Sequence, residues 1–81
     1  MAFFVYVLKS KKDESCYVES TQNLTARLKM HNLGRSRYTK GHRPWSLIYK
    51  EKFDLRTAAV KRERYLKSGV GRKELKQLIS S

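Results

Sequence analysis

Blocks of apolar residues separated by polar segments run along this chain and predict three β-strands. Residues 3–9 and 45–53, and more briefly residues 16–19, are rich in aromatic and β-branched side chains, as strands are. The first block is almost continuously apolar, which predicts a strand buried on both faces. In the last block Trp45, Leu47 and Tyr49 occupy alternate positions, as residues on one face of a strand do.

The polar segment between the first two blocks predicts a hairpin connection. If the turn places Lys9 opposite Glu14, Tyr6 lies opposite Tyr17 across the two strands. Side chains that face each other in this way are close enough for both phenols to reach one site.

A first helix is predicted after the second strand, because Leu24 and Leu28 are four residues apart. Ser20 or Thr21 is expected to cap its start. Gly34 follows it where a residue of left-handed conformation commonly ends a helix.

Two more helices are predicted after the third strand. Asp54 is expected to cap a helix over residues 55–67, Gly69 and Gly71 to break the chain, and residues 75–79 to form a last short helix. The order strand, strand, helix, strand, helix, helix predicts an α+β fold, with a three-stranded antiparallel sheet flanked by helices. Its 81 residues have room for one domain, residues 1–81.

Charge points to a polyanionic partner. The chain has 19 Lys and Arg residues against 7 Asp and Glu, a net charge of +12. Nucleic acid is the first candidate partner, and an anionic membrane surface is the second. The loop 35–44 combines cations with ring faces suited to base stacking. The residues expected to bind nucleic acid are Lys9, Arg35, Arg37, Tyr38, Lys40, His42, Arg43 and Lys67.

The single Cys16 cannot form an internal disulfide, which favours a reducing compartment. The apolar start is followed too soon by Lys9, Lys11 and Lys12 to be a signal peptide. No apolar segment has the length that spans a membrane. The expected location is the cytoplasm, with no membrane attachment and a monomer as the favoured state.

Five side chains have the chemistry to hold a phosphate and activate water: Tyr6, Tyr17, Arg27, His31 and Glu63. The guanidinium is a planar fork that matches phosphate oxygens, and a carboxylate can hold Mg²⁺. A phenol, with a pKa near about 10, becomes a base only where nearby cations favour phenolate. The imidazole is the competing base. Simpler roles stay open, because the tyrosines can be ordinary strand aromatics and Glu63 can pair with Arg27 or Lys67.

An ordered set of short motifs surrounds these side chains. The tyrosine triplets VYV and YVE at residues 5–7 and 17–19 are followed by the segment 20–34, which contains Asn23, Arg27, His31 and Gly34. YTK at 38–40, PW at 44–45, YKE at 49–51 and AVKRE at 59–63 complete the set. With these spacings the chain, from about Phe4 to Ile79, resembles the GIY-YIG nuclease domain, and specifically its small single-domain bacterial members.

The resemblance implies an endonuclease that hydrolyses DNA phosphodiester bonds with one divalent ion, Mg²⁺ or Mn²⁺, in DNA repair or recombination. It implies that Glu63 binds the metal, that Arg27 stabilises the charge of the transition state, and that Tyr17 activates water with support from Tyr6 and His31. RNA remains an alternative substrate.

Glu19 departs from this pattern, because the family has glycine at that position. A carboxylate there can repel substrate, pair with Arg27 or serve as an extra metal ligand. Two functions therefore stay open: a metal-dependent endonuclease, and a catalytically impaired module that binds nucleic acid with the same scaffold and basic surface.

Overall fold

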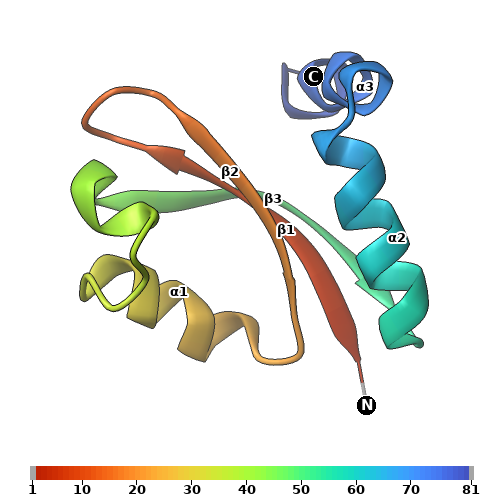
Figure 1. The fold of residues 1–81 in the computed structure, drawn as a ribbon, viewed down its shortest axis with the longest axis horizontal. Coiled ribbons are helices and arrows are strands. Elements are labelled where there is room, and N and C mark those ends of the chain that lie inside the picture. The colour runs from red at the N-terminus through yellow and green to blue at the C-terminus, as the bar shows by residue number, and fades with distance from the viewer. Residues whose placement is uncertain (1, 81) are drawn as a thin grey trace.

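The sheet at the centre of the fold has its three strands in the order β2-β1-β3 (Figure 1). In this computed structural model, which describes residues 2–80, the strands are β1 (Phe3–Ser10), β2 (Cys16–Thr21) and β3 (Trp45–Phe53). The helices are α1 (Leu24–Asn32), α2 (Arg56–Lys67) and α3 (Gly69–Ser80), and a short 3-10 helix, η1 (Thr39–His42), precedes β3. Both neighbours of β1 are antiparallel to it, so the predicted α+β fold and element order are confirmed.

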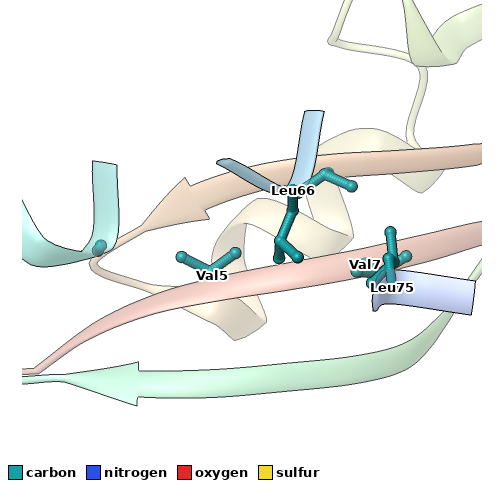
Figure 2. Close-up of a cluster of buried hydrophobic side chains, with 6 residues drawn as sticks. Val5, Val7, Leu66 and Leu75 are labelled. Atoms are coloured by element: carbon teal, nitrogen blue, oxygen red, sulfur yellow. The ribbon is translucent and has the colours of Figure 1, made fainter. Parts of the chain in front are cut away.

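β1 separates two cores, which explains its apolar sequence. Val5 and Val7 face α2 and α3, where they pack against Leu66 and Leu75 (Figure 2). Tyr6 and Leu8 face the opposite side, which α1 covers. The side chains of residues 5–8 are fully buried, as the sequence predicted for a strand covered on both faces.

The pairing of β1 with β2 differs from the predicted register by two residues. Lys9 pairs with Cys16, and Tyr6 therefore lies opposite Glu19. In this wider turn Ser10 accepts hydrogen bonds from the amides of Lys12, Asp13 and Glu14, and Glu14 adopts a left-handed conformation with φ of 62°. Tyr17 lies opposite Leu8, on the same face as Tyr6 and Glu19.

β3 contains a bulge that the sequence did not predict. Val7 pairs with Tyr49 and Leu8 with Leu47, so the residue between Leu47 and Tyr49 has no partner. Leu47 therefore lies in the α1 core while Tyr49 packs in the other core. The alternate spacing of Leu47 and Tyr49 predicted that both lie on one face of the sheet, and the bulge makes this prediction wrong.

Two predicted helix caps are also wrong. The side chain of Asn23 accepts a hydrogen bond from the Ala26 amide and caps α1, whereas the Thr21 hydroxyl accepts one from the amide of Asn23. Asp54 does not cap α2, whose N-cap is Leu55 without a side-chain hydrogen bond. Gly34 follows α1 with φ of 79°, as its position predicted.

Gly71 lies inside α3 and does not break the chain. It is buried against the last turn of α2, where a Cβ atom would lie 1.7 Å from the Tyr65 carbonyl oxygen. α3 starts directly after Ser68, and the missing side chain lets its first turn approach the α2 backbone.

Arg62 ties these helices to the sheet. Its guanidinium donates to both carboxylate oxygens of Glu51 on β3, at 2.8 and 3.0 Å, and to Glu74 on α3 at 2.6 Å. A fork shared between two carboxylates fixes the orientation of α2, and so the positions of its other side chains, relative to the sheet.

No helix within residues 2–80 is long and apolar enough to cross a membrane.

Gly71→Ala is expected to destabilise the fold by about 1–3 kcal/mol, because the new methyl group overlaps backbone that cannot move independently. Gly69→Ala is the matched control in the same helix, since a Cβ atom there meets nothing within 4 Å. The control is expected to be neutral or slightly stabilising. Chemical denaturation measures both, and equal free energies of unfolding for the two variants would contradict the close-packing role of Gly71.

Candidate active site

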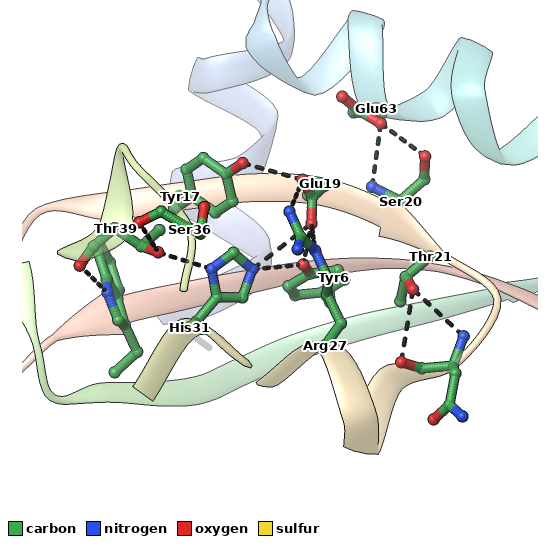
Figure 3. Close-up of polar contacts among 12 residues, drawn as sticks. Tyr6, Tyr17, Glu19, Ser20, Thr21, Arg27, His31, Ser36, Thr39 and Glu63 are labelled. Atoms are coloured by element: carbon green, nitrogen blue, oxygen red, sulfur yellow. Dashed lines mark hydrogen bonds and ion pairs between the residues drawn. The ribbon is translucent and has the colours of Figure 1, made fainter. Parts of the chain in front are cut away.

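The Glu19 carboxylate lies at the centre of the site, and side chains from three elements converge on it (Figure 3). Arg27 on α1 donates from Nε to one carboxylate oxygen at 2.7 Å and from Nη2 to the other at 3.0 Å. Tyr17 on β2 donates its hydroxyl to Glu19 at 3.0 Å. Tyr6 on β1 donates to the oxygen that also accepts from Arg27 Nε. The carboxylate is therefore held by two phenols and one guanidinium.

The pairing of β1 with β2 and the four-residue spacing on α1 bring these groups together. The register places Tyr6 directly opposite Glu19, and Tyr17 is two residues earlier on the same face of β2. Arg27 and His31 are four residues apart on α1 and therefore point from the same helix face toward the sheet. Four of the five predicted catalytic residues thus meet at one place.

His31 is fully buried, and both of its ring nitrogens have partners. Nε2 lies 2.9 Å from the Tyr6 hydroxyl, and Nδ1 lies 2.7 Å from Oγ1 of Thr39. Because Tyr6 gives its only hydroxyl proton to Glu19, the consistent neutral tautomer carries its proton on Nε2 and accepts from Thr39. Burial lowers the pKa of His31, and its proximity to Arg27 lowers it further against the opposing effect of Glu19.

The two phenols are poor bases in this arrangement. Burial and the charge of Glu19 raise the pKa of Tyr17 to about 12. Burial and the hydrogen bond to Glu19 raise the pKa of Tyr6 further still. The charge of Arg27 alone does not favour phenolate here, because burial and Glu19 outweigh it.

Glu19 itself is ionised. Burial raises the pKa of this carboxyl group, but hydrogen bonds from Arg27, Tyr6 and Tyr17 lower it more, to about 2. No buried side-chain nitrogen or oxygen within residues 2–80 lacks a hydrogen-bond partner, so every buried polar side-chain atom of the cluster is satisfied.

Glu63 lies apart from this cluster, on the α2 side of β2 (Figure 3). One of its oxygens accepts from the Ser20 amide at 3.0 Å and from the Ser20 hydroxyl at 2.6 Å, and the other pairs with Lys67 at 2.7 Å. Ser20 directly follows Glu19 along β2, so the two carboxylates are placed by adjacent residues of one strand. The pairing with Lys67, one of the alternatives left open by the sequence, is confirmed.

The donor set suits a single magnesium-like ion only in part. Within residues 2–80, no three His, Cys, Asp or Glu side chains cluster as a metal-binding group. Mg²⁺ nevertheless needs only one or two carboxylates when water and substrate phosphates complete its shell. Glu63 can supply one oxygen if Lys67, whose side chain is 47% exposed, moves away.

The predicted nucleic-acid-binding residues are mostly exposed. Tyr38 stacks on Tyr17 with ring centroids 5.3 Å apart and is still 56% exposed. His42 is half-buried and pairs with Asp13 at 2.5 Å, so it joins the η1 loop to the hairpin and is less available. The remaining cations are exposed: Lys9, Arg35, Arg37, Lys40, Arg43 and Lys67.

Two residues of the site were not predicted. Thr39 fixes the orientation of His31, and Ser20 holds Glu63. Both lie within the motifs that carry the family resemblance, and this was the one sequence signal that could have identified them. Their partners could not be predicted, because they are 8 and 43 residues away in the sequence.

Comparison with known proteins places the chain among small bacterial proteins. The GIY-YIG catalytic domain matches residues 2–76. A UPF0213 protein of Clostridium perfringens is 46% identical over 79 residues, covering 96% of this chain and 83% of that protein. A UPF0213 protein of Staphylococcus haemolyticus is 38% identical, covering 93% of this chain and 92% of the relative.

A solved structure of another UPF0213 protein is also similar to this chain. The solution NMR structure of a UPF0213 protein of Bacillus halodurans aligns with a TM-score of 0.59 and 31% sequence identity. The alignment covers 96% of this chain and 85% of that one.

The lowered pKa of Glu19 predicts how the free energy of unfolding changes at acid pH. A carboxylate whose pKa falls from 4.5 to about 2 on folding stabilises the fold above its unfolded pKa. That contribution, on the order of 3 kcal/mol, is lost as the pH falls through this window. The free energy of unfolding is therefore expected to fall more steeply between pH 4.5 and 2 in the wild type than in Glu19→Gln. Subtracting the two curves removes the contributions of the other carboxylates, and parallel curves would refute the strong pairing of Glu19.

Proposed function

This chain belongs to the GIY-YIG family, and on that premise we propose that it is an endonuclease that hydrolyses DNA phosphodiester bonds with one divalent ion, Mg²⁺ or Mn²⁺. The observation that carries the proposal is the convergence of Arg27, Tyr6 and Tyr17 on one carboxylate. The proposed setting is the cytoplasm, in DNA repair or recombination, and RNA is the alternative substrate.

The groups around Glu19 form a binding site for an oxyanion. A carboxylate and a phosphate both present two oxygens with a shared negative charge, and an arginine fork bonds to either in the same way. The side chain of Glu19 therefore occupies the place that a phosphate of the substrate would take. Substrate must displace this carboxylate before Arg27 can bind the phosphate.

The solvent exposure of each side chain in the cluster indicates which role it would have. Arg27, with 28% of its side chain exposed, would neutralise the phosphate oxygens. Tyr17 is only half-buried, so its hydroxyl can meet water, and loss of the nearby Glu19 charge would lower its pKa. His31 is fully buried with both nitrogens engaged, which favours a role in holding Tyr6 over a role as the base.

Glu63 is the proposed metal ligand. Nucleases of this family generally use a divalent metal ion, which would stabilise the charge that develops on the leaving oxygen. In this chain, Ser20 orients the Glu63 carboxylate and Lys67 balances its charge.

The bidentate pair between Glu19 and Arg27 supports a second candidate, a module that binds nucleic acid without cutting it. Glu19 uses both donor groups that Arg27 would offer to phosphate, at 2.7 and 3.0 Å. The net charge of +12 would still bind a polyanion through the exposed cations. The two functions differ in one property, because only the nuclease produces metal-dependent cleavage.

Glu63→Gln is expected to abolish cleavage of supercoiled, single-stranded or branched DNA in Mg²⁺ or Mn²⁺, because an amide cannot hold the ion as a carboxylate does. Binding of Mn²⁺, measured by its paramagnetic broadening of nearby resonances, should weaken in parallel. Glu14→Gln removes one charge from an exposed carboxylate of the hairpin and is the matched control. Full cleavage by Glu63→Gln, in protein free of contaminating nuclease, would reject Glu63 as the metal ligand.

Glu19→Gly is expected to raise the cleavage rate about fivefold or more, since repulsion between unit charges 4 Å apart is about 1 kcal/mol even in water. Glu19→Gln separates the loss of charge from the loss of bulk. Cleavage rates at matched metal and salt concentrations test this, with circular dichroism as the control for folding. If Glu19→Gly is slower than the wild type, Glu19 is a ligand or base of the reaction. If neither protein cuts any DNA with either metal, the binding module is the correct function.

A further inference from the structure

A groove of about 560 Å³ lies between β2 and the helices α2 and α3. Its floor is apolar and comes from all three elements: Val18, Leu66 and Leu75 are each at most 8% exposed. The volume is in the range of pockets that hold small organic ligands. The groove is therefore large enough for a nucleobase and its sugar.

The polar side chains along the groove are basic. Lys67, Arg72 and Lys76 line it, and none of its lining residues is acidic. Each of these three cations is exposed, so they form a rim above the apolar floor. This combination fits a ligand that has an apolar ring and negative charge.

One end of the groove adjoins the candidate active site. Tyr17 and Tyr38 line it, and Tyr38 presents more than half of its side chain to solvent. The hydroxyl of the same Tyr17 donates to Glu19 in the oxyanion site. Lys67 likewise lines the groove and pairs with Glu63. Each carboxylate of the site is thus bonded to a side chain that lines the groove.

We propose that this groove holds the base of an unpaired nucleotide next to the phosphate bound at Arg27. Tyr38 and the apolar floor would contact the base, and the rim cations would contact the neighbouring phosphates, as in proteins that bind single strands. Bases paired within a duplex cannot enter such a groove. The position of the phosphate rests on the proposed function, and the implied substrate class is single-stranded or branched DNA with an unpaired nucleotide at the site.

A second copy of this chain is a less suitable occupant. Each copy has a net charge of +12, and the groove is lined by three cations without an acidic residue. A polyanion is attracted by the charge that would repel another copy.

The test compares binding of a short single-stranded DNA with binding of a duplex that has the same number of phosphates, without metal, by fluorescence anisotropy. The wild type is expected to bind the single strand more tightly. Tyr38→Ala should weaken single-strand binding about tenfold, the effect of losing one stacked base, with less than about a twofold effect on the duplex. A 2-aminopurine base in the single strand should change its emission on binding to the wild type and not to Tyr38→Ala.

A charge-matched pair of variants keeps the test independent of Tyr38. Lys76→Ala removes a cation of the rim, whereas Lys52→Ala removes an exposed cation of β3 that does not line the groove. Lys76→Ala should weaken single-strand binding more than Lys52→Ala does. Equal effects of these two variants, or equal affinity of the wild type for single strand and duplex, would overturn the proposal.

Further outcomes distinguish this proposal from a second copy in the groove and from the proposed nuclease activity. A dimer seen in sedimentation velocity that Tyr38→Ala or Lys76→Ala dissociates would overturn it in favour of a second copy in the groove. Single-strand preference without metal-dependent cleavage would support the groove and count against the nuclease. Cleavage of duplex DNA without single-strand preference would support the nuclease and overturn the proposal for the groove.

Discussion

The Glu19 carboxylate is the constraint on which the site depends, because a charge that is taken out of water must be paired and hydrogen-bonded. Its side chain is only 19% exposed. Arg27, Tyr6 and Tyr17 satisfy it, and they link α1 to both strands of the hairpin. Through Tyr6 and His31 the same network reaches Thr39 in η1. A single carboxylate thereby fixes the positions of four elements.

The network that stabilises the fold also sets the chemistry of the site. Glu19 holds Arg27, Tyr6 and Tyr17 together, but it also neutralises the charge of Arg27, and the pKa of each phenol is raised. Neither Arg27 nor Glu19 can stay buried without a partner at low cost, so the ion pair opens only if another anion binds Arg27 and the Glu19 carboxylate turns toward water. Substrate phosphate is such an anion, and the exchange leaves the number of donors and the net charge of the cluster nearly unchanged. Under the proposed function, activity therefore depends on the competition between Glu19 and phosphate for Arg27.

Features that depend on local periodicity could be predicted from the sequence, whereas features that depend on distant contacts could not. The strands, the three helices and the shared face of Arg27 and His31 result from spacings of two and four residues. The register of β1 and β2 instead depends on the hairpin conformation at Glu14, and the glycine at position 71 reflects its close packing against the Tyr65 backbone rather than a break in the helix. The sequence left the pairing of Glu19 with Arg27 as one of three roles. Choosing among them required the distance between a strand and a helix.

β2 connects the oxyanion site to the groove, because alternate residues of a strand face opposite sides of a sheet. Glu19 points to the α1 side, whereas Val18 and Ser20 point to the α2 side, where the groove and Glu63 lie. β2 is also an edge strand, so no further strand of the sheet covers its outer side (Figure 1). A bound nucleic acid can pass over this edge with its phosphate on one side and its base on the other. Under the two proposals, the residues of β2 that face the bound phosphate and the residue that forms the floor of the groove are therefore neighbours along one strand.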